Sequence, residues 1–246
     1  MEIGPFTVVG PDVEIGAGTR VLSHVVLEGA VHIGAGNTIG HGCVIGGAPQ
    51  DLAFKAETRS AVQIGGGNVL REYCTIHRGT TEGSTTAIGD GNFLMAGVHI
   101  GHNCRVANGV IIANNCLLAG HVEIDDRAFI GGGTTFHQYM RVGRLVMAQG
   151  SSGFGKDIPP FLLAAKRNLV FGVNVVGMRR AGFTAAERDD VKRAFKLLYR
   201  SGLNTRQALE EAARTDFGPL GREFFAFVEN AKKRGIVPYR HAAEEL

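Results

Sequence analysis

The sequence predicts a mainly β protein, a parallel β-helix of hexapeptide repeats followed by a C-terminal helical domain. Three observations support this prediction. An aliphatic residue recurs at every sixth position through most of residues 1–154, glycine often follows it, and the hydrophobic period changes after residue 157. An amphipathic helix would space its apolar residues three and four apart, and a half-buried strand would alternate every two residues. A period of six fits neither element alone and is typical of a β-helix.

In this interpretation three hexapeptides form one coil of about 18 residues. Each short strand places one aliphatic side chain inside and then turns a corner, and coils stack about 4.8 Å apart through backbone hydrogen bonds. Glycine after the aliphatic residue, as at Gly16, Gly34 and Gly89, suits a corner that needs unusual dihedral angles. The inward positions are Ile3, Val9, Ile15, Val21, Leu27, Ile33, Ile39 and Ile45, then Ile64, Leu70 and Ile76, then Ile88, Leu94, Ile100, Val106, Ile112, Leu118, Ile124, Ile130, Phe136 and Val142.

Two segments break the period. The interval from Ile45 to Ile64 is one residue too long for three repeats, and its middle, with Asp51, does not keep the pattern. It must leave the coil as a loop, and loops on a rigid scaffold commonly carry function. Residues 80–86 are also irregular, but they preserve the count between Ile76 and Ile88. A bulged corner is the simplest interpretation there.

The repeat ends at Asp157-Ile158-Pro159-Pro160, where the prolines are expected to stop strand pairing. We therefore predict a β-helix domain at residues 1–156 and a helical domain at residues 157–246. Thr184 and Glu187 form a capping box that begins a helix ending near Gly202, and two more helices are expected at 206–214 and 221–234. These helices would cover the open strand edges of the last coil. The N-terminus has no comparable cap, so either its edge is exposed or a first coil precedes it.

Composition narrows the class of protein. The four cysteines show no paired spacing and are expected to be buried thiols. No run approaches the roughly 18 apolar residues of a membrane span, and the start lacks a signal sequence, so a cytoplasmic protein is expected. Residues 155–246 carry 17 Lys and Arg against 11 Asp and Glu, whereas residues 1–154 carry 9 against 12. The basic part could attract an acidic macromolecule or phosphate, or could be a solvated helix surface, and no nucleic-acid-binding motif appears.

Histidines gather in the later coils. With about 18 residues per coil, His102, Gly120 and Gln138 stack in one column, and His121 lies one place beside it. A histidine beside a backbone amide supplies a general base and an oxyanion donor, as acyl transfer requires, because the unperturbed pKa of histidine is about 6.5. The residues alone leave three alternatives: surface histidines, a zinc site of three imidazoles at a subunit boundary, or ligand binding by hydrogen bonds. The histidines concerned are His99, His102, His121 and His137.

Several longer sequence segments help to choose among these three roles for the histidines. The strings Val98–Cys104, Leu118–Val122, Phe136–Gln138, Asp157–Pro160 and Phe171–Asn174 resemble those of the bacterial acyl-carrier-protein:UDP-N-acetylglucosamine O-acyltransferases. The resemblance covers essentially the whole chain and implies the first step of lipid A synthesis. It also implies a left-handed β-helix, an exception to the usual right-handed crossover. The resemblance further implies a homotrimer with active sites between neighbouring subunits, and no metal or other cofactor.

The resemblance implies a role for each matching position. His102 would remove a proton from the glucosamine 3-hydroxyl, which attacks the thioester of a (R)-3-hydroxyacyl carrier protein, while the Gly120 amide holds the oxyanion. Met147 and Gly150 would measure acyl length, and a glycine there favours a longer chain. The positions expected to bind the sugar nucleotide are Gln50, Asp51, His99, His121, His137, Gln138, Asn174 and Arg180.

Four positions depart from the best-known family pattern. Asn103 replaces an Asp, Ala53 a Lys, Val176 a Glu and Ala181 an Arg. Lost charge-assisted hydrogen bonds, worth about 1.5–3 kcal/mol each, suggest altered affinity or an altered sugar nucleotide. Two alternatives therefore accompany the main prediction: a related acyltransferase acting on another UDP-amino sugar, such as a 3-amino analogue, and a trimeric binding protein without catalysis.

Overall fold

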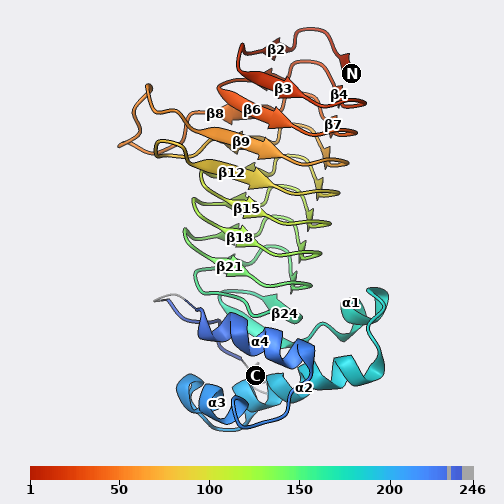
Figure 1. The fold of residues 1–246 in the computed structure, drawn as a ribbon, viewed down its shortest axis with the longest axis vertical. Helices are drawn as coiled ribbons and strands as arrows, with labels where there is room; N and C mark the ends of the chain where they lie inside the picture. The colour runs from red at the N-terminus through yellow and green to blue at the C-terminus, as the bar shows by residue number, and fades with distance from the viewer. Residues whose placement is uncertain (232–233, 240–246) are drawn as a thin grey trace.

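The structure of this chain is a computed structural model that describes residues 1–231 and 234–239. The first part is a triangular prism of three sheets, and the helices lie across its C-terminal end (Figure 1). Each regular coil contributes one short strand to each sheet, the strands of neighbouring coils pair in parallel, and the coil is left-handed. The predicted fold class is confirmed.

We name the three faces sheets A, B and C. Sheet A contains β1 (Glu2–Ile3), β4 (Arg20–Val21), β7 (Thr38–Ile39), β10 (Val69–Leu70), β13 (Phe93–Leu94), β16 (Ile111–Ile112), β19 (Phe129–Ile130), β22 (Met147–Ala148), β24 (Leu162–Ala165) and β25 (Leu169–Val173). Sheet B contains β2 (Val8–Val9), β5 (Val26–Leu27), β8 (Val44–Gly47), β11 (Thr75–His77), β14 (His99–Ile100), β17 (Leu117–Leu118), β20 (Thr135–Phe136) and β23 (Gly153–Phe154). Sheet C contains β3 (Val13–Ile15), β6 (Ala30–Ile33), β9 (Ala61–Ile64), β12 (Thr85–Ile88), β15 (Arg105–Val106), β18 (Glu123–Ile124) and β21 (Arg141–Val142).

The inward positions of the repeat form the core. On sheet B, Ile76 pairs with Ile100, Ile100 with Leu118, and Leu118 with Phe136, and none of the four side chains is more than 3% exposed. Burying one such side chain stabilises a protein by about 1.5–3 kcal/mol. The hexapeptide period therefore supplies the apolar interior that holds the coils together.

The glycine that follows the aliphatic residue is required for a different reason than expected. Gly16, Gly34 and Gly89 do not have positive φ values. Instead, a Cβ on Gly34 would lie 2.6 Å from the carbonyl oxygen of Gly65 in the next coil. The prediction of unusual dihedral angles at these positions is wrong, because the constraint is the close approach of two backbones. Positive φ values occur two residues later, as at Gly36.

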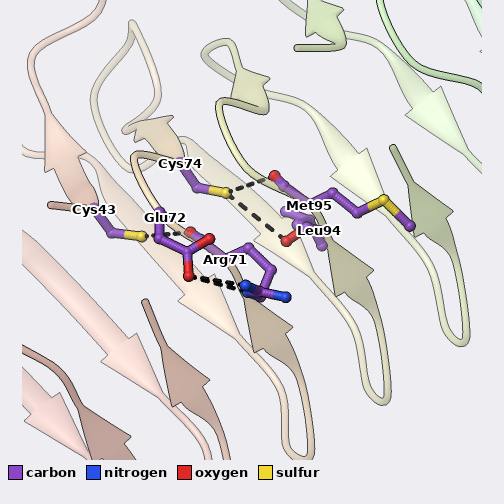
Figure 2. Close-up of polar contacts among 6 residues, drawn as sticks. All are labelled: Cys43, Arg71, Glu72, Cys74, Leu94 and Met95. Atoms are coloured by element: carbon purple, nitrogen blue, oxygen red, sulfur yellow. Dashed lines mark hydrogen bonds and ion pairs between the residues drawn. The ribbon is translucent and has the colours of Figure 1, made fainter. Parts of the chain in front are cut away.

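The four cysteines are buried free thiols, as predicted. Cys43 and Cys74 occupy adjacent coils, and each donates to a backbone carbonyl, Cys43 to Arg71 O at 3.0 Å and Cys74 to Met95 O at 3.3 Å (Figure 2). Burial raises the pKa of Cys104 to about 12. Since the thiolate is the nucleophilic form, Cys104 is unsuited to attack a thioester.

Strand pairing does not stop at Pro159 and Pro160, contrary to the prediction. Strand β24 pairs with β22, with Leu163 opposite Met147, and then β25 returns antiparallel to β24. The two prolines lie in the segment before β24, outside the ladder, where a missing N–H removes no strand hydrogen bond. The position of the domain boundary after residue 156 stays a prediction.

Four helices follow the hairpin: α1 (Val175–Arg180), α2 (Ala185–Arg200), α3 (Thr205–Ala212) and α4 (Pro219–Glu229). The predicted capping box is present, with Thr184 and Glu187 bonded to each other's backbone N–H. Helix α1 was not predicted, and α4 ends earlier than expected, at Glu229. Residues 232–233, at the end of that predicted helix, and residues 240–246 lie outside the described residues. Within the described chain, no helix is long and apolar enough to cross a membrane.

Candidate active site

One edge of the prism collects most of the predicted site residues. At this B–C edge, each coil passes from a strand of sheet B to a strand of sheet C. The excursion of residues 48–60 leaves between β8 and β9, which confirms the predicted loop, and it projects from the prism at the level of these strands (Figure 1). The irregular residues 78–84, then His102, Gly120 and Gln138, occupy the same edge in successive coils.

His102 is almost buried and is held by its neighbour Asn103. His102 is 9% exposed. Its imidazole Nδ1 lies 3.0 Å from Asn103 Oδ1. Asn103 Oδ1 also accepts from the backbone N–H of Thr80 at 3.1 Å and from its hydroxyl at 3.0 Å. Because an amide oxygen only accepts, Nδ1 must carry the proton and Nε2 the lone pair. The basic nitrogen of His102 is therefore Nε2, which does not contact Asn103.

Gly120 lies against the face of this imidazole. A Cβ added at Gly120 would be 2.9 Å from His102 Nδ1 and closer still to Cε1 and Nε2, so the ring fits only because residue 120 is glycine. The N–H of Gly120 has no acceptor among the described residues. A free backbone donor and a free ring nitrogen thus share one corner.

His121 and Tyr139 extend the aromatic surface beside His102. The His121 ring meets His102 edge-on with centroids 5.2 Å apart, and it stacks on Tyr139 at 4.4 Å. Both His121 and Tyr139 have positive φ values, near 60° and 65°. Tyr139 is exposed and His121 is partly exposed, so both side chains can contact a ligand at the edge.

His99 projects from the outer surface of sheet B, next to the corner. Its Nδ1 lies 2.7 Å from Thr75 Oγ1, and its ring meets His77 edge-on at 4.8 Å. Burial, with His99 and His102 nearby, lowers the pKa of His77 to about 4, and burial together with His102 lowers the pKa of His99. The two imidazoles are therefore neutral at pH 7 and suited to hydrogen bonds with uncharged hydroxyl groups.

Four other predicted residues of the edge form no hydrogen bond, ion pair or ring contact with His102 within the described part of one protomer. Gln50 and Asp51 are exposed on the excursion loop, where Asp51 Oδ1 accepts from Ala53 N–H at 2.9 Å. His137 and Gln138 are exposed on the coil beyond Gly120. These four exposed side chains share the edge with His102.

Four predicted residues lie elsewhere on the protomer. Met147 is on β22 of sheet A, the face opposite the B–C edge, and Gly150 follows it in the A–B corner. Asn174 caps α1, with Oδ1 accepting from Gly177 N–H at 2.9 Å and Nδ2 donating to Leu145 O at 2.9 Å. Arg180 is exposed at the end of the same helix. One protomer alone does not bring these residues to His102.

Sequence reasoning missed the residues that orient the central imidazole. Thr80 anchors Asn103, and Tyr139 stacks on His121, yet neither was a candidate. The irregular residues 80–86 were the available signal for Thr80. Within the part of the chain that the structure describes, no three His, Cys, Asp or Glu side chains are grouped to hold a metal ion.

Comparisons with known proteins identify the family of this chain. A family model described as UDP N-acetylglucosamine O-acyltransferase, domain 2, matches residues 157–237, and one for the bacterial transferase hexapeptide (six repeats) matches residues 85–120. A Synechocystis acyl-[acyl-carrier-protein]–UDP-N-acetylglucosamine O-acyltransferase is 43% identical over 87% of this chain and 79% of its own length. The enzyme of the same name from Thermodesulfovibrio yellowstonii is 44% identical over 95% of this chain and 91% of its own.

Solved structures give the same result. LpxA from Acinetobacter baumannii matches with a TM-score of 0.91 and 38% identity, covering 96% of this chain and 92% of its own. The UDP-N-acetylglucosamine acyltransferase of Francisella novicida matches with a TM-score of 0.92 and 36% identity, covering 98% and 88%. Sequence and structure comparisons therefore point to one family over nearly the entire chain.

Proposed function

This chain belongs to the acyl-[acyl-carrier-protein]–UDP-N-acetylglucosamine O-acyltransferase family and is an acyltransferase, and from that premise we propose its substrates and catalytic residues. The acyl donor is a (R)-3-hydroxyacyl group carried as a thioester by acyl carrier protein. The acceptor is the 3-hydroxyl of UDP-N-acetylglucosamine, and the reaction is the first step of lipid A biosynthesis. The names of the relatives support both substrates.

His102 is the general base. Its Nδ1 proton is held by Asn103 Oδ1, which leaves the Nε2 lone pair to accept a proton from the sugar hydroxyl. The hydroxyl oxygen then attacks the thioester carbonyl carbon. As the C–S bond breaks, the proton on Nε2 passes to the departing thiolate of the carrier. The single observation that carries this assignment is the hydrogen bond between His102 Nδ1 and Asn103 Oδ1, an oxygen that also accepts from Thr80.

Gly120 supplies the oxyanion donor. Its N–H has no acceptor among the described residues and lies at the corner where the imidazole rests on the glycine. A backbone donor aimed at the oxygen on which negative charge develops contributes about 2.7–4 kcal/mol to transition-state stabilisation in comparable enzymes. The neutral His99, together with His121, Gln138 and the loop residues Gln50 and Asp51, binds the sugar.

The complete site forms between protomers of a homotrimer. Met147 and Gly150, which set acyl length, and Asn174 and Arg180, which bind the nucleotide, lie away from the B–C edge of their own protomer. A second copy must present them to His102. An apolar row on the outer surface of sheet A supports this association, because its residues stand opposite one another in successive coils: Val69, Phe93, Ile111, Phe129, Met147 and Leu163.

The test compares purified wild type, His102→Ala and His32→Ala with acyl carrier protein thioester and UDP-N-acetylglucosamine. His102→Ala should lose about 10²–10⁴-fold in turnover, the usual contribution of a general base, with an unchanged thermal transition. His32→Ala, an exposed imidazole on sheet C, should retain full activity. Turnover by His102→Ala within a few-fold of wild type would refute its role.

The same assay tests the substrate. Product mass spectrometry with UDP-N-acetylglucosamine and its 3-amino analogue distinguishes an O-acyltransferase from an N-acyltransferase. Exclusive use of the amino sugar by wild type would overturn the proposed acceptor while leaving the general base in place. Gel filtration with light scattering tests the homotrimer.

A further inference from the structure

A cavity lies on the outer surface of sheet B, toward the C-terminal end of the prism. Its volume is about 710 Å³, and it is lined by residues of the last coils and of the turn between β24 and β25. Its lining includes Thr135, His137, Gly153, Lys166, Arg167 and Asn168. None of these six is the base or the oxyanion donor of the proposed reaction, and only His137 is among the positions that the resemblance assigns to the sugar nucleotide.

The cavity exists because the turn between β24 and β25 crosses the end of sheet B at Gly153. Gly153 pairs with Thr135 on one side and forms a bridge with Arg167 on the other. Gly153 N–H donates to Lys166 O at 2.8 Å, and Asn168 N–H donates to Gly153 O at 3.1 Å. Asn168 Oδ1 also accepts from Gly155 N–H at 2.6 Å. The turn is thus fixed to β23, and the missing side chain at Gly153 leaves the hollow.

The lining is basic and, among the described residues, contains no carboxylate. Lys166 and Arg167 are exposed at the cavity, together with the polar side chains of Thr135, His137 and Asn168. Four other surface cavities of the described chain are each lined by at least two Asp or Glu residues. This cavity therefore differs from those four in having the charge that attracts an anion.

Two further cations extend the basic surface toward the B–C edge. Lys156 is exposed, and the Arg234 guanidinium reaches within 4.0 Å of the position a Cβ on Gly155 would take. Lys156 continues the column of Gln138 by one more coil. It therefore stands three coils from His102, about 14 Å along the prism. The basic surface and the reacting centre share one edge at a separation that one extended substrate can span.

We propose that this cavity is a phosphate-binding subsite, with Arg167 as its principal ligand. A guanidinium binds phosphate through two parallel hydrogen bonds, and Asn168 and Thr135 offer further donors. The inference rests on the proposed function, since both of its substrates are phosphate esters. The nucleotide carries a diphosphate, and the prosthetic arm of the carrier protein is attached through a phosphodiester.

The first experiment measures binding without catalysis. Isothermal titration of the full-length protein with UDP and with inorganic pyrophosphate is compared for wild type, Arg167→Ala, Arg167→Lys and Arg206→Ala. Arg206 is an exposed cation on α3 and serves as the matched control. If the diphosphate occupies the cavity, Arg167→Ala should lower the affinity for UDP and for pyrophosphate by about tenfold or more. Arg167→Lys should recover part of this loss. Arg206→Ala should bind as wild type does.

The second experiment tests the carrier arm. The KM for an acyl phosphopantetheine is compared with that for the acyl pantetheine lacking phosphate, in the same four proteins. If the phosphodiester occupies the cavity, Arg167→Ala should abolish the preference for the phosphorylated donor and leave UDP affinity unchanged. Unchanged UDP and pyrophosphate affinity together with an unchanged donor preference in folded Arg167→Ala would overturn the proposal. Arg167-dependent pyrophosphate binding by a wild type that transfers no acyl group would instead refute the proposed function and leave the subsite intact.

Discussion

Replacing Gly120 by Ala should disable catalysis without unfolding the protein. The new Cβ would lie 2.9 Å from His102 Nδ1 and closer to two other ring atoms, whereas non-bonded carbon contacts prefer about 3.5–4.0 Å. The imidazole must therefore move by about 1 Å, and the hydrogen bond from Nδ1 to Asn103 resists that movement. A displacement of this size in a catalytic group can reduce the rate about a hundredfold. In free energy this is about 2.7 kcal/mol of transition-state stabilisation.

The assay is kcat/KM with acyl carrier protein thioester and UDP-N-acetylglucosamine, with the thermal transition measured in parallel. Gly172→Ala is the control, because a Cβ there would meet no heavy atom within 4 Å and the backbone does not have a positive φ. In a His102→Ala background the Gly120→Ala change should cause little further loss, since both changes act on one ring. If kcat/KM of Gly120→Ala stays within about threefold of the wild-type value, the close contact between residue 120 and the imidazole is not required for catalysis, and the reasoning is refuted.

Three further predictions follow from the structure. Asn103→Asp should move the acid limb of the kcat/KM profile to higher pH, because a carboxylate beside Nδ1 of His102 favours the imidazolium. An acid limb at the same pH as in wild type would contradict the contact between residue 103 and the His102 ring. Ile112→Ala, at a position with 0% exposure in the prism core, should lower the free energy of unfolding by about 2–5 kcal/mol in urea titrations, and a loss below about 1 kcal/mol would argue against a packed interior. Since the folded pKa of His77 is about 4 and the reference value is 6.5, the unfolded chain binds more protons between these values, so stability should fall as pH drops through that window. His77→Asn should therefore show a smaller decrease in Tm between pH 7 and 5 than wild type, and an equal decrease would show that another group is responsible.

Regular positions of the site were predictable because the coil repeats. Backbone hydrogen bonds fix each residue opposite its equivalent in the next coil, so the spacing alone placed His102, Gly120 and Gln138 in one column. The same reasoning failed at the ends of the repeat. The prolines predicted an end to strand pairing, but β24 and β25 continue sheet A, because the chain turns past Pro160 before it pairs again.

Contacts across an irregular segment were not predictable. Thr80 reaches Asn103 across 23 positions that include the irregular corner, and no periodic argument gives that distance. The stacking of His121 on Tyr139 depends on two left-handed corner residues, neither of which is glycine. Such side-chain contacts depend on corner conformation and rotamer, and a hydrophobic period carries no information on either.

The sequence by itself determined the three-sided coil, its apolar interior and the column of catalytic candidates, because these follow from a local repeat joined by short-range backbone pairing. Only the tertiary structure decided which imidazole nitrogen is free and where the basic cavity forms. The first depends on Asn103 meeting Thr80, and the second on the β24–β25 hairpin crossing Gly153. Both are contacts between segments outside the regular repeat, where position along the chain no longer fixes position in space.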